Sequence, residues 1–180
     1  LGKVIGSMSG KKVTVAGSGS GLEIWADVVV AVPAGKQAIV KQRVGSVAAE
    51  EIVGDLVLDT GSGAITVRKI TGEVVADTGS GAIEASQIKG DFSADTGSGS
   101  VFAEDIVAEE FKVDTGSGRV EGVAIECESL YVDTGSGSVD VRGVQADRVN
   151  IDTGSGSVKL QLDRMGDGKF VLDTGSGSVT

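Results

Sequence analysis

The segment KFVLDTGSGSV, residues 169–179, contains a motif that recurs through the chain. The pentapeptide DTGSG begins at Asp59, Asp77, Asp95, Asp114, Asp133, Asp152 and Asp173. The intervals between successive copies are 18, 18, 19, 19, 19 and 21 residues. A nearly constant period of this length is typical of a repeat protein in which each repeat stacks on its neighbours.

The residues before each motif alternate between apolar and variable positions. The third residue before the aspartate and the residue directly before it are apolar in every copy. These columns are Leu56, Val74, Phe92, Phe111, Leu130, Val149 and Phe170, and then Leu58, Ala76, Ala94, Val113, Val132, Ile151 and Leu172. The residue between them is often polar, as at Ser93 and Lys112. A period of two predicts a strand with one buried face.

The residues after each motif continue this pattern. The sixth residue after the aspartate is Ile65, Ile83, Val101, Val120, Val139, Val158 or Val179. A further apolar column holds Ile70, Ile88, Ile106, Ile125 and Val144, and a small residue follows at Gly72, Gly90, Ala108, Cys127 and Ala146. Each repeat therefore predicts a coil of two to three short strands, with equivalent positions about 4.8 Å apart in neighbouring coils.

The repeats predict an all-β protein whose fold is a single-chain parallel β-solenoid, or β-helix, with coils of 18–21 residues. The crossover rule favours a right-handed coil. Only 3% aromatic residues and 29 glycines exclude a core built from large side chains. We expect the regular solenoid over residues 41–180, where KQRVG at 41–45 replaces the first motif, and irregular coils or a cap over residues 1–40.

Alternation through the motif places its threonine inward and its aspartate outward. We expect each aspartate to accept backbone N–H groups of its own turn, the glycines to permit positive φ, and the threonine hydroxyls to bond from coil to coil. The seven outward aspartates are also candidates for binding a cation such as Ca²⁺. The turns lack the doubled glycines of the calcium-binding nonapeptide repeat.

An Asp-Thr-Gly-Ser sequence after apolar residues is also how an aspartic protease presents a catalytic aspartate. That chemistry needs two carboxylates brought together from two lobes or subunits, and copies one coil apart provide no lobes. The chain has no His, and Cys127 occupies a corner position that Gly or Ala fills in other coils. We therefore expect no catalytic residue, no cofactor and no enzymatic activity.

The net charge and the apolar runs of the chain limit which partners the protein can bind. The formal net charge is −10 without a run of Lys or Arg, so we expect no binding to nucleic acid. The longest apolar run, VVVAV at residues 28–32, is far shorter than a membrane span, so we expect no membrane insertion. A single cysteine leaves the redox compartment undecided.

The segments VPAG at residues 32–35 and VGSVAAEEIVGDLVLDTGSGAITV at residues 44–67, with the repeats that follow, resemble a bacterial adhesin-like family of β-strand-repeat domains of unknown function. The similarity covers residues of about 28–180. It implies a right-handed β-helix that is secreted or located at the cell surface, with an adhesive or scaffolding role. The family contributes no catalytic residues.

Two functional hypotheses follow. The first is a non-catalytic extracellular structural or adhesive solenoid, and the second is a module that binds a surface glycan or another partner. The second requires outward aromatic residues, for which Phe102 and Tyr131 are the candidates.

The two ends of the chain predict head-to-tail self-association into a filament. The last coil stops at DTGSGSVT, and the N-terminal segment continues its pattern. In that register Leu1 falls in the column of Val67, Val4 in that of Ile70, Gly6 at the corner of Gly72, and Met8 in the column of Val74. The predicted interface is Leu1, Val4, Gly6, Met8, Val179 and Thr180. The alternative is a monomer.

Overall fold

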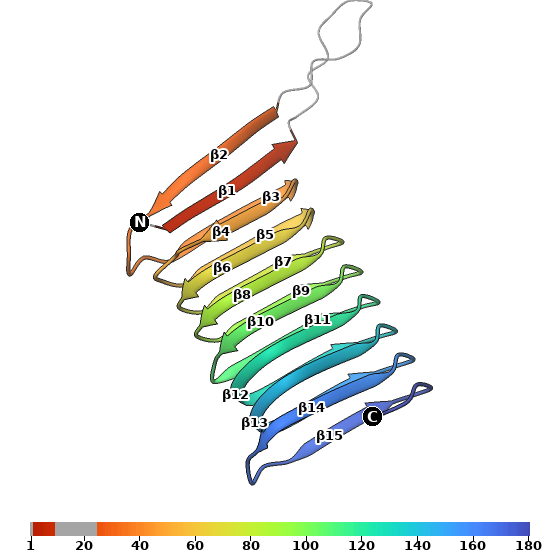
Figure 1. The fold of residues 1–180 in the computed structure, drawn as a ribbon. Coiled ribbons are helices and arrows are strands. Elements are labelled where there is room, and N and C mark those ends of the chain that lie inside the picture. The colour runs from red at the N-terminus through yellow and green to blue at the C-terminus, as the bar shows by residue number, and fades with distance from the viewer. Residues whose placement is uncertain (1, 10–24) are drawn as a thin grey trace, which may run out of the picture.

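The computed structural model describes residues 2–9 and 25–180, and every regular element in these residues is a β-strand (Figure 1). The strands are β1 (Gly2–Ser9), β2 (Trp25–Val32), β3 (Ala38–Val44), β4 (Val47–Glu50), β5 (Leu56–Ser62), β6 (Ile65–Thr71), β7 (Val74–Thr78), β8 (Ile83–Lys89), β9 (Phe92–Thr96), β10 (Val101–Val107), β11 (Glu110–Thr115), β12 (Val120–Thr134), β13 (Val139–Thr153), β14 (Val158–Met165) and β15 (Phe170–Thr174). No helix in the described part is long and apolar enough to cross a membrane.

The strands form a parallel β-solenoid, as the repeats predict. Strands β4, β6, β8 and β10 stack on one side of the solenoid, and β3, β5, β7, β9 and β11 stack on the other. The long strands β12 and β13 run along both sides (Figure 1). Equivalent residues pair in register, so that Asp77 aligns with Asp59 and with Asp95.

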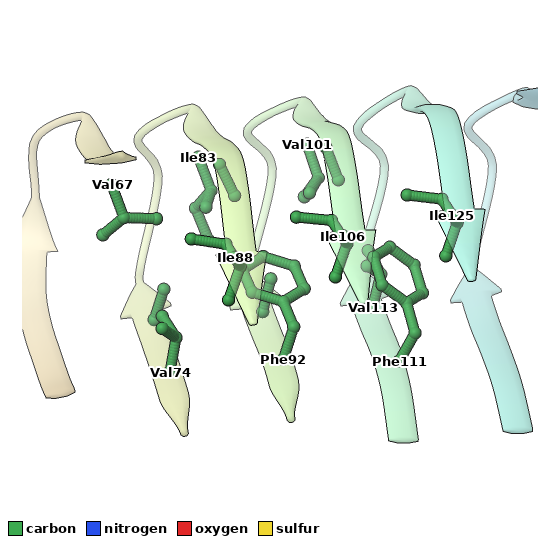
Figure 2. Packing of buried hydrophobic residues seen from close by; sticks show 14 of the residues in the cluster. Val67, Val74, Ile83, Ile88, Phe92, Val101, Ile106, Phe111, Val113 and Ile125 are labelled. Carbon is green, nitrogen blue, oxygen red and sulfur yellow. The ribbon is translucent and has the colours of Figure 1, made fainter. Parts of the chain in front are cut away.

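The core consists of the predicted apolar columns. Figure 2 shows side chains from both sides of the solenoid that meet in its interior. Phe92 and Phe111, in successive coils, stack with ring centroids 5.4 Å apart. The column of Ile65 and Ile83 is fully buried as far as Val158, whereas Val179 in the last coil is 44% exposed. Because each coil covers the apolar face of the next, burial depends on neighbours.

The coils from β4 to β13 turn a first corner at a residue with left-handed backbone geometry. Glu51, Lys69, Gln87, Asp105 and Ala124 have φ between 54° and 58°, and Gly143 has a φ of 66° at the equivalent position. Two successive residues, Arg68 and Lys69, therefore face outward before Ile70 returns to the core. This geometry costs a non-glycine residue about 1–2 kcal/mol. Burial of the isoleucine column that follows is large enough to offset that cost.

A second corner explains why the coils differ in length. In the two 18-residue coils the predicted small residue is Gly72 or Gly90, with φ of 141° or 134°. A Cβ at Gly72 would overlap the carbonyl group of Gly54 in the preceding coil. In two of the 19-residue coils Cys127 and Ala146 take this position, and β12 and β13 continue through it without interruption.

The N-terminal strand, which belongs to the predicted head-to-tail interface, pairs within its own chain. One edge of β1 pairs antiparallel with β2, and its other edge pairs antiparallel with β4, where Val4 aligns with Ala49 and Gly6 with Val47. Both edges of β1, which also contains Met8, are therefore paired within the chain, and completion of the last coil of another copy by this segment stays a prediction. Leu1 lies outside the described residues.

The other half of the predicted interface pairs with its own chain. Val179 forms a parallel bridge with Val158, and the N–H of Thr180 donates to the Val158 carbonyl at 3.0 Å. The 21-residue interval before Asp173 coincides with a register shift between β13 and β14 around Val144. Contact between Val179, Thr180 and another copy stays a prediction.

Candidate functional site

The threonine of each DTGSG motif joins two coils through its hydroxyl group. The hydroxyl of Thr78 donates to the carbonyl oxygen of Gly63 in the preceding coil at 3.0 Å, and its oxygen accepts the N–H of Gly81 at 3.2 Å. The donated bond recurs at 2.8–3.3 Å for Thr60, Thr96, Thr115, Thr134, Thr153 and Thr174. Every motif threonine except Thr174 is at most 1% exposed. The inward orientation and the bonding between coils are confirmed.

The motif glycines are required by the close approach of successive coils. A Cβ at Gly81 would overlap the carbonyl oxygen of Gly63, and a Cβ at Gly99 would overlap that of Gly81. Neither Gly81 nor Gly99 has a positive φ, although Gly63 does. The prediction that these positions need glycine for a positive φ is therefore wrong for most copies. They need glycine because a side chain would clash with the preceding coil.

The aspartates face outward as predicted, but they do not cap their own turns. Among the described residues, no motif aspartate accepts an N–H of its turn, and the N–H groups of the two motif glycines go to other oxygens. The N–H of Gly79, for example, donates to the carbonyl oxygen of Thr60 in the preceding coil at 3.1 Å. The expected Asx turn is therefore wrong, and the threonine performs the capping.

The column of aspartates concentrates negative charge on one line of the surface. Partial burial, followed by the neighbouring charges of Asp95 and Asp133, raises the pKa of Asp114. Within residues 2–9 and 25–180 no group of three or more His, Cys, Asp or Glu side chains is arranged to hold a metal ion. Cation binding by the aspartate column stays a prediction, and no cluster of metal-ligating side chains in the described residues supports it.

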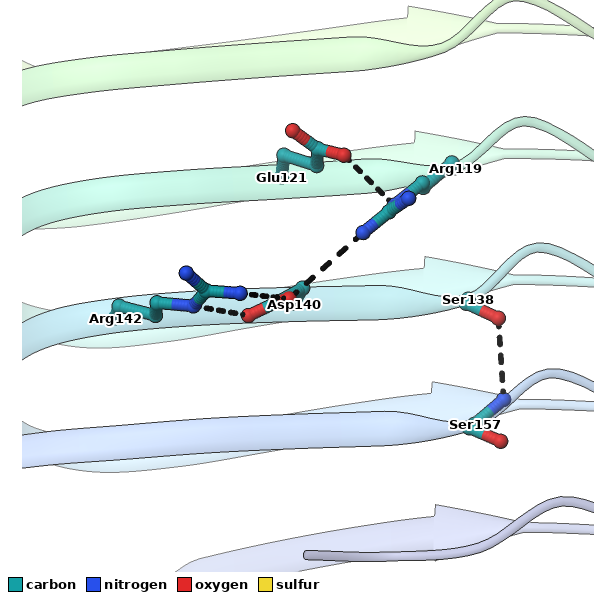
Figure 3. Close-up of polar contacts among 6 residues, drawn as sticks. All are labelled: Arg119, Glu121, Ser138, Asp140, Arg142 and Ser157. Carbon is teal, nitrogen blue, oxygen red and sulfur yellow. Dashed lines mark hydrogen bonds and ion pairs between the residues drawn. The ribbon is translucent and has the colours of Figure 1, made fainter.

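A network of ion pairs covers part of the other side of the solenoid (Figure 3). Arg119 contacts Glu121 at 2.8 Å and Asp140 at 3.7 Å, and Arg142 donates two hydrogen bonds to Asp140 at 2.8 and 2.6 Å. These bonds from Arg142 lower the pKa of Asp140 below its usual value. The N–H of Ser157 also reaches the Ser138 hydroxyl in the preceding coil at 3.4 Å. This network was not predicted from the sequence. The signal that could have identified it is the opposite charge of residues at outward positions in neighbouring coils.

The single cysteine is a corner residue of the core. Cys127 is 8% exposed, and burial followed by the charge of Asp147 raises the pKa of its thiol to about 12. The thiol is therefore protonated at neutral pH and cannot act as a nucleophile in that state.

The two outward aromatic residues lie on opposite sides of the solenoid. Phe102 projects from β10 and is 37% exposed beside Glu84, Glu104 and Asp105. Tyr131 lies on β12 and is half-buried, next to a groove that also contains residues of β13 and of the segment leading into β15. The two aromatic residues therefore do not lie close to each other.

The comparisons with known proteins agree with this architecture. No curated protein and no solved structure shows significant similarity to the chain. The model of the Toastrack DUF4097 family, a domain of unknown function, matches residues 10–180. This match covers nearly all of the stacked coils, and the chain therefore belongs to the Toastrack DUF4097 family.

Proposed function

We propose that this domain is a rigid, non-catalytic solenoid that serves as a structural or adhesive element outside the cell. The observation that carries the proposal is the ladder of threonine hydroxyls, in which each buried hydroxyl bonds to the preceding coil. Separation of two coils would break one of these bonds along with the backbone bonds between the coils, and the side-chain bond alone contributes about 0.5–1.5 kcal/mol. The ladder therefore favours a stiff rod over a hinged one.

The chemistry of the side chains supports a role without catalysis. The sequence has no His, and the thiol of Cys127 is buried with a raised pKa. The motif aspartates form one line on the surface, with one aspartate in each coil. This arrangement differs from the two lobes or subunits that bring two carboxylates together in an aspartic protease. A rod of equivalent coils instead presents the same outward groups at regular intervals, as a scaffold or an adhesive surface requires.

Hydrogen exchange tests the rigidity. We expect the amides of the coils between β5 and β13 to exchange only through a shared, cooperative opening, with similar free energies in successive coils. Thr115→Val should speed exchange in the coils on either side of it, and Thr71→Val, at an exposed position, should not. Independent opening of a central coil in the unmodified protein would contradict the rigid rod.

Protease treatment of intact producing cells tests the location. An epitope inserted after Asp167, in an exposed turn between β14 and β15, should be cleaved from intact cells by an added protease. Cleavage only after lysis would contradict a location outside the cell, and it would leave the rigidity measured by hydrogen exchange unaffected.

A further inference from the structure

A groove crosses three successive coils on the side of the solenoid that carries the motif aspartates. Its volume is about 400 Å³. Its outward side chains are Ser129, Tyr131, Arg148, Asn150, Lys169 and Val171. Tyr131 aligns with Asn150, and Asn150 aligns with Val171, so these three form one rank across the coils. The other three residues form a second rank, four positions before the motif aspartates.

Tyr131 forms a fixed wall of this groove. Its hydroxyl donates a hydrogen bond to Asp133 at 3.2 Å, and the ammonium group of Lys112 lies over its ring, 5.9 Å from the centroid. Lys112 belongs to β11, whereas the other groove residues belong to later coils, so the groove lies on the opposite side of Tyr131 from Lys112. A side chain held on two sides loses little conformational entropy when a ligand packs against it.

The second rank changes its charge at the groove. In the four coils before it the equivalent residues are all acidic, namely Asp55, Glu73, Asp91 and Glu110. Ser129 is neutral, and Arg148 and Lys169 are cationic. The groove therefore lies where this rank turns from negative to positive.

The two cations are available to a ligand. The Nε of Arg148 donates a hydrogen bond to the Ser129 hydroxyl at 3.0 Å, which fixes the guanidinium group. The two terminal nitrogens of the guanidinium take no part in that bond. Across the described ranges, the ion pairs involve other side chains, and neither Arg148 nor Lys169 has a carboxylate within 4.0 Å. Arg148 also lines a second hollow, together with Arg164 and the acids Glu128, Asp147 and Asp167.

The motif aspartates act unequally on this groove, because Asp133 bonds to the Tyr131 hydroxyl at one end and Asp152 lies farther from Arg148. Asp152 follows Arg148 by four residues along an extended strand, which corresponds to about 13 Å. The screening length at physiological ionic strength is about 8 Å, so an anion bound at Arg148 experiences a weakened repulsion from Asp152.

We propose that this groove binds an acidic saccharide, a function that goes beyond the structural role. A pyranose ring has an apolar C–H face, which can pack on the ring of Tyr131 and on Val171. Its hydroxyl groups can bond to the amide of Asn150, and a carboxylate on the sugar matches the paired donors of Arg148 and the charge of Lys169. A concave site with an apolar wall and a few convergent polar groups is the usual form of a small-ligand site.

The test is titration calorimetry of the whole chain with tetragalacturonic acid, and its fully methyl-esterified form serves as the matched neutral ligand. We expect binding of the acid that weakens as salt is added, and binding of the ester that is at least about tenfold weaker. Tyr131→Ala and Arg148→Gln should each weaken binding of the acid by about tenfold. Tyr131→Phe, which keeps the ring, should stay within about twofold of the unmodified protein.

Two variants outside the groove serve as controls. Phe102→Ala removes the outward aromatic residue on the other side, and Lys89→Gln removes an exposed cation at a corner. Both should bind the acid as the unmodified protein does, and circular dichroism should show that every variant keeps its strands. The proposal is overturned if the acid does not bind at millimolar concentration or if the ester binds equally well. A loss on Phe102→Ala as large as that on Tyr131→Ala also overturns it.

Discussion

The hydroxyl of Thr96 donates a hydrogen bond to the carbonyl oxygen of Gly81, which lies 3.0 Å away in the preceding coil. The same oxygen of Thr96 accepts the N–H of Gly99 at 3.1 Å. One buried side chain thus closes its own turn and joins it to the turn before it. Repetition of this pair of bonds along the chain makes the DTGSG motif a structural linkage between coils.

Replacement of Thr96 by Val should remove this linkage. The change keeps the shape of the side chain and leaves the Gly81 carbonyl and the Gly99 N–H without their partner, so we expect the free energy of unfolding to fall by about 2–3 kcal/mol. Thr96→Ser should retain most of it. Urea unfolding followed by circular dichroism measures the change, and Thr71→Val at an exposed position should alter stability by less than about 0.5 kcal/mol. Equal stability of Thr96→Val and the unmodified protein would remove the energetic basis of the ladder.

Replacement of Gly99 by Ala should be still more damaging. The new Cβ would overlap the carbonyl oxygen of Gly81, and both atoms belong to backbones that stacking holds in place. We expect a loss of about 3 kcal/mol, measured by thermal unfolding. Ser98→Ala, one residue earlier at an exposed position, is the matched control and should be nearly neutral. A mild effect of Gly99→Ala would mean that the coils can separate slightly at little cost.

Replacement of Gln87 by Gly should stabilise the solenoid. Gln87 has a φ of 58°, a region that glycine enters without steric cost. The greater entropy of glycine in the unfolded chain offsets part of the gain, so we expect a net increase of about 1 kcal/mol. The reverse change, Gly143→Ala, should lower stability by a similar amount, because a Cβ there has room but the backbone has a φ of 66°. A gain from Gln87→Ala as large as that from Gln87→Gly would point to side-chain effects instead.

Replacement of Asp114 by Asn should stabilise the protein at neutral pH. Burial and the charges of Asp95 and Asp133 raise the pKa of Asp114, so the folded state holds this proton more tightly than the unfolded state does. The stability that this group contributes is therefore fully present below the unfolded pKa of about 3.9 and falls as the pH rises through the folded pKa. With solvent screening we expect a gain of at most about 0.5 kcal/mol at neutral pH and low salt.

Urea midpoints at several pH values and salt concentrations measure this effect. The gain from Asp114→Asn should shrink in acid, where the carboxyl is protonated in both states, and in high salt, where the repulsion is screened. Glu126→Gln, at an exposed position outside the column, serves as the control for the loss of one charge. A lower midpoint for Asp114→Asn at neutral pH would show that the carboxylate makes a favourable contact.

The thiol of Cys127 should be inert until the protein unfolds. Burial raises its pKa to about 12, against about 8.5 in an unfolded chain. We expect Ellman's reagent to modify the native protein about a thousandfold more slowly than the urea-unfolded protein at mildly alkaline pH. Because the folded pKa is the higher one, stability should also fall as the pH rises from about 8.5 towards 12. Rapid modification of the folded protein would indicate that this corner opens.

Much of the fold was predictable from particular residues. The apolar residues at Leu56 and Leu58 and the inward Thr60 follow from alternation along a single strand. The recurrence of the same pattern at Val74, Ala76 and Thr78 then requires parallel, in-register stacking. The left-handed corner at Lys69 was not predictable in this way, because a residue type that seldom adopts positive φ gives no local signal for it.

The sequence by itself thus determined the coil, its period and its inward columns, because these depend on the local alternation of side chains. Only the tertiary structure decided which partners the backbone takes. It gave the turn N–H groups to threonine hydroxyls and carbonyl oxygens instead of aspartates, and it paired β1 with β4 of its own chain. It also brought Tyr131 and Lys169 to one groove from separate coils. Such choices depend on which donors and acceptors come within bonding distance after the coils have stacked, and a local pattern does not contain that information.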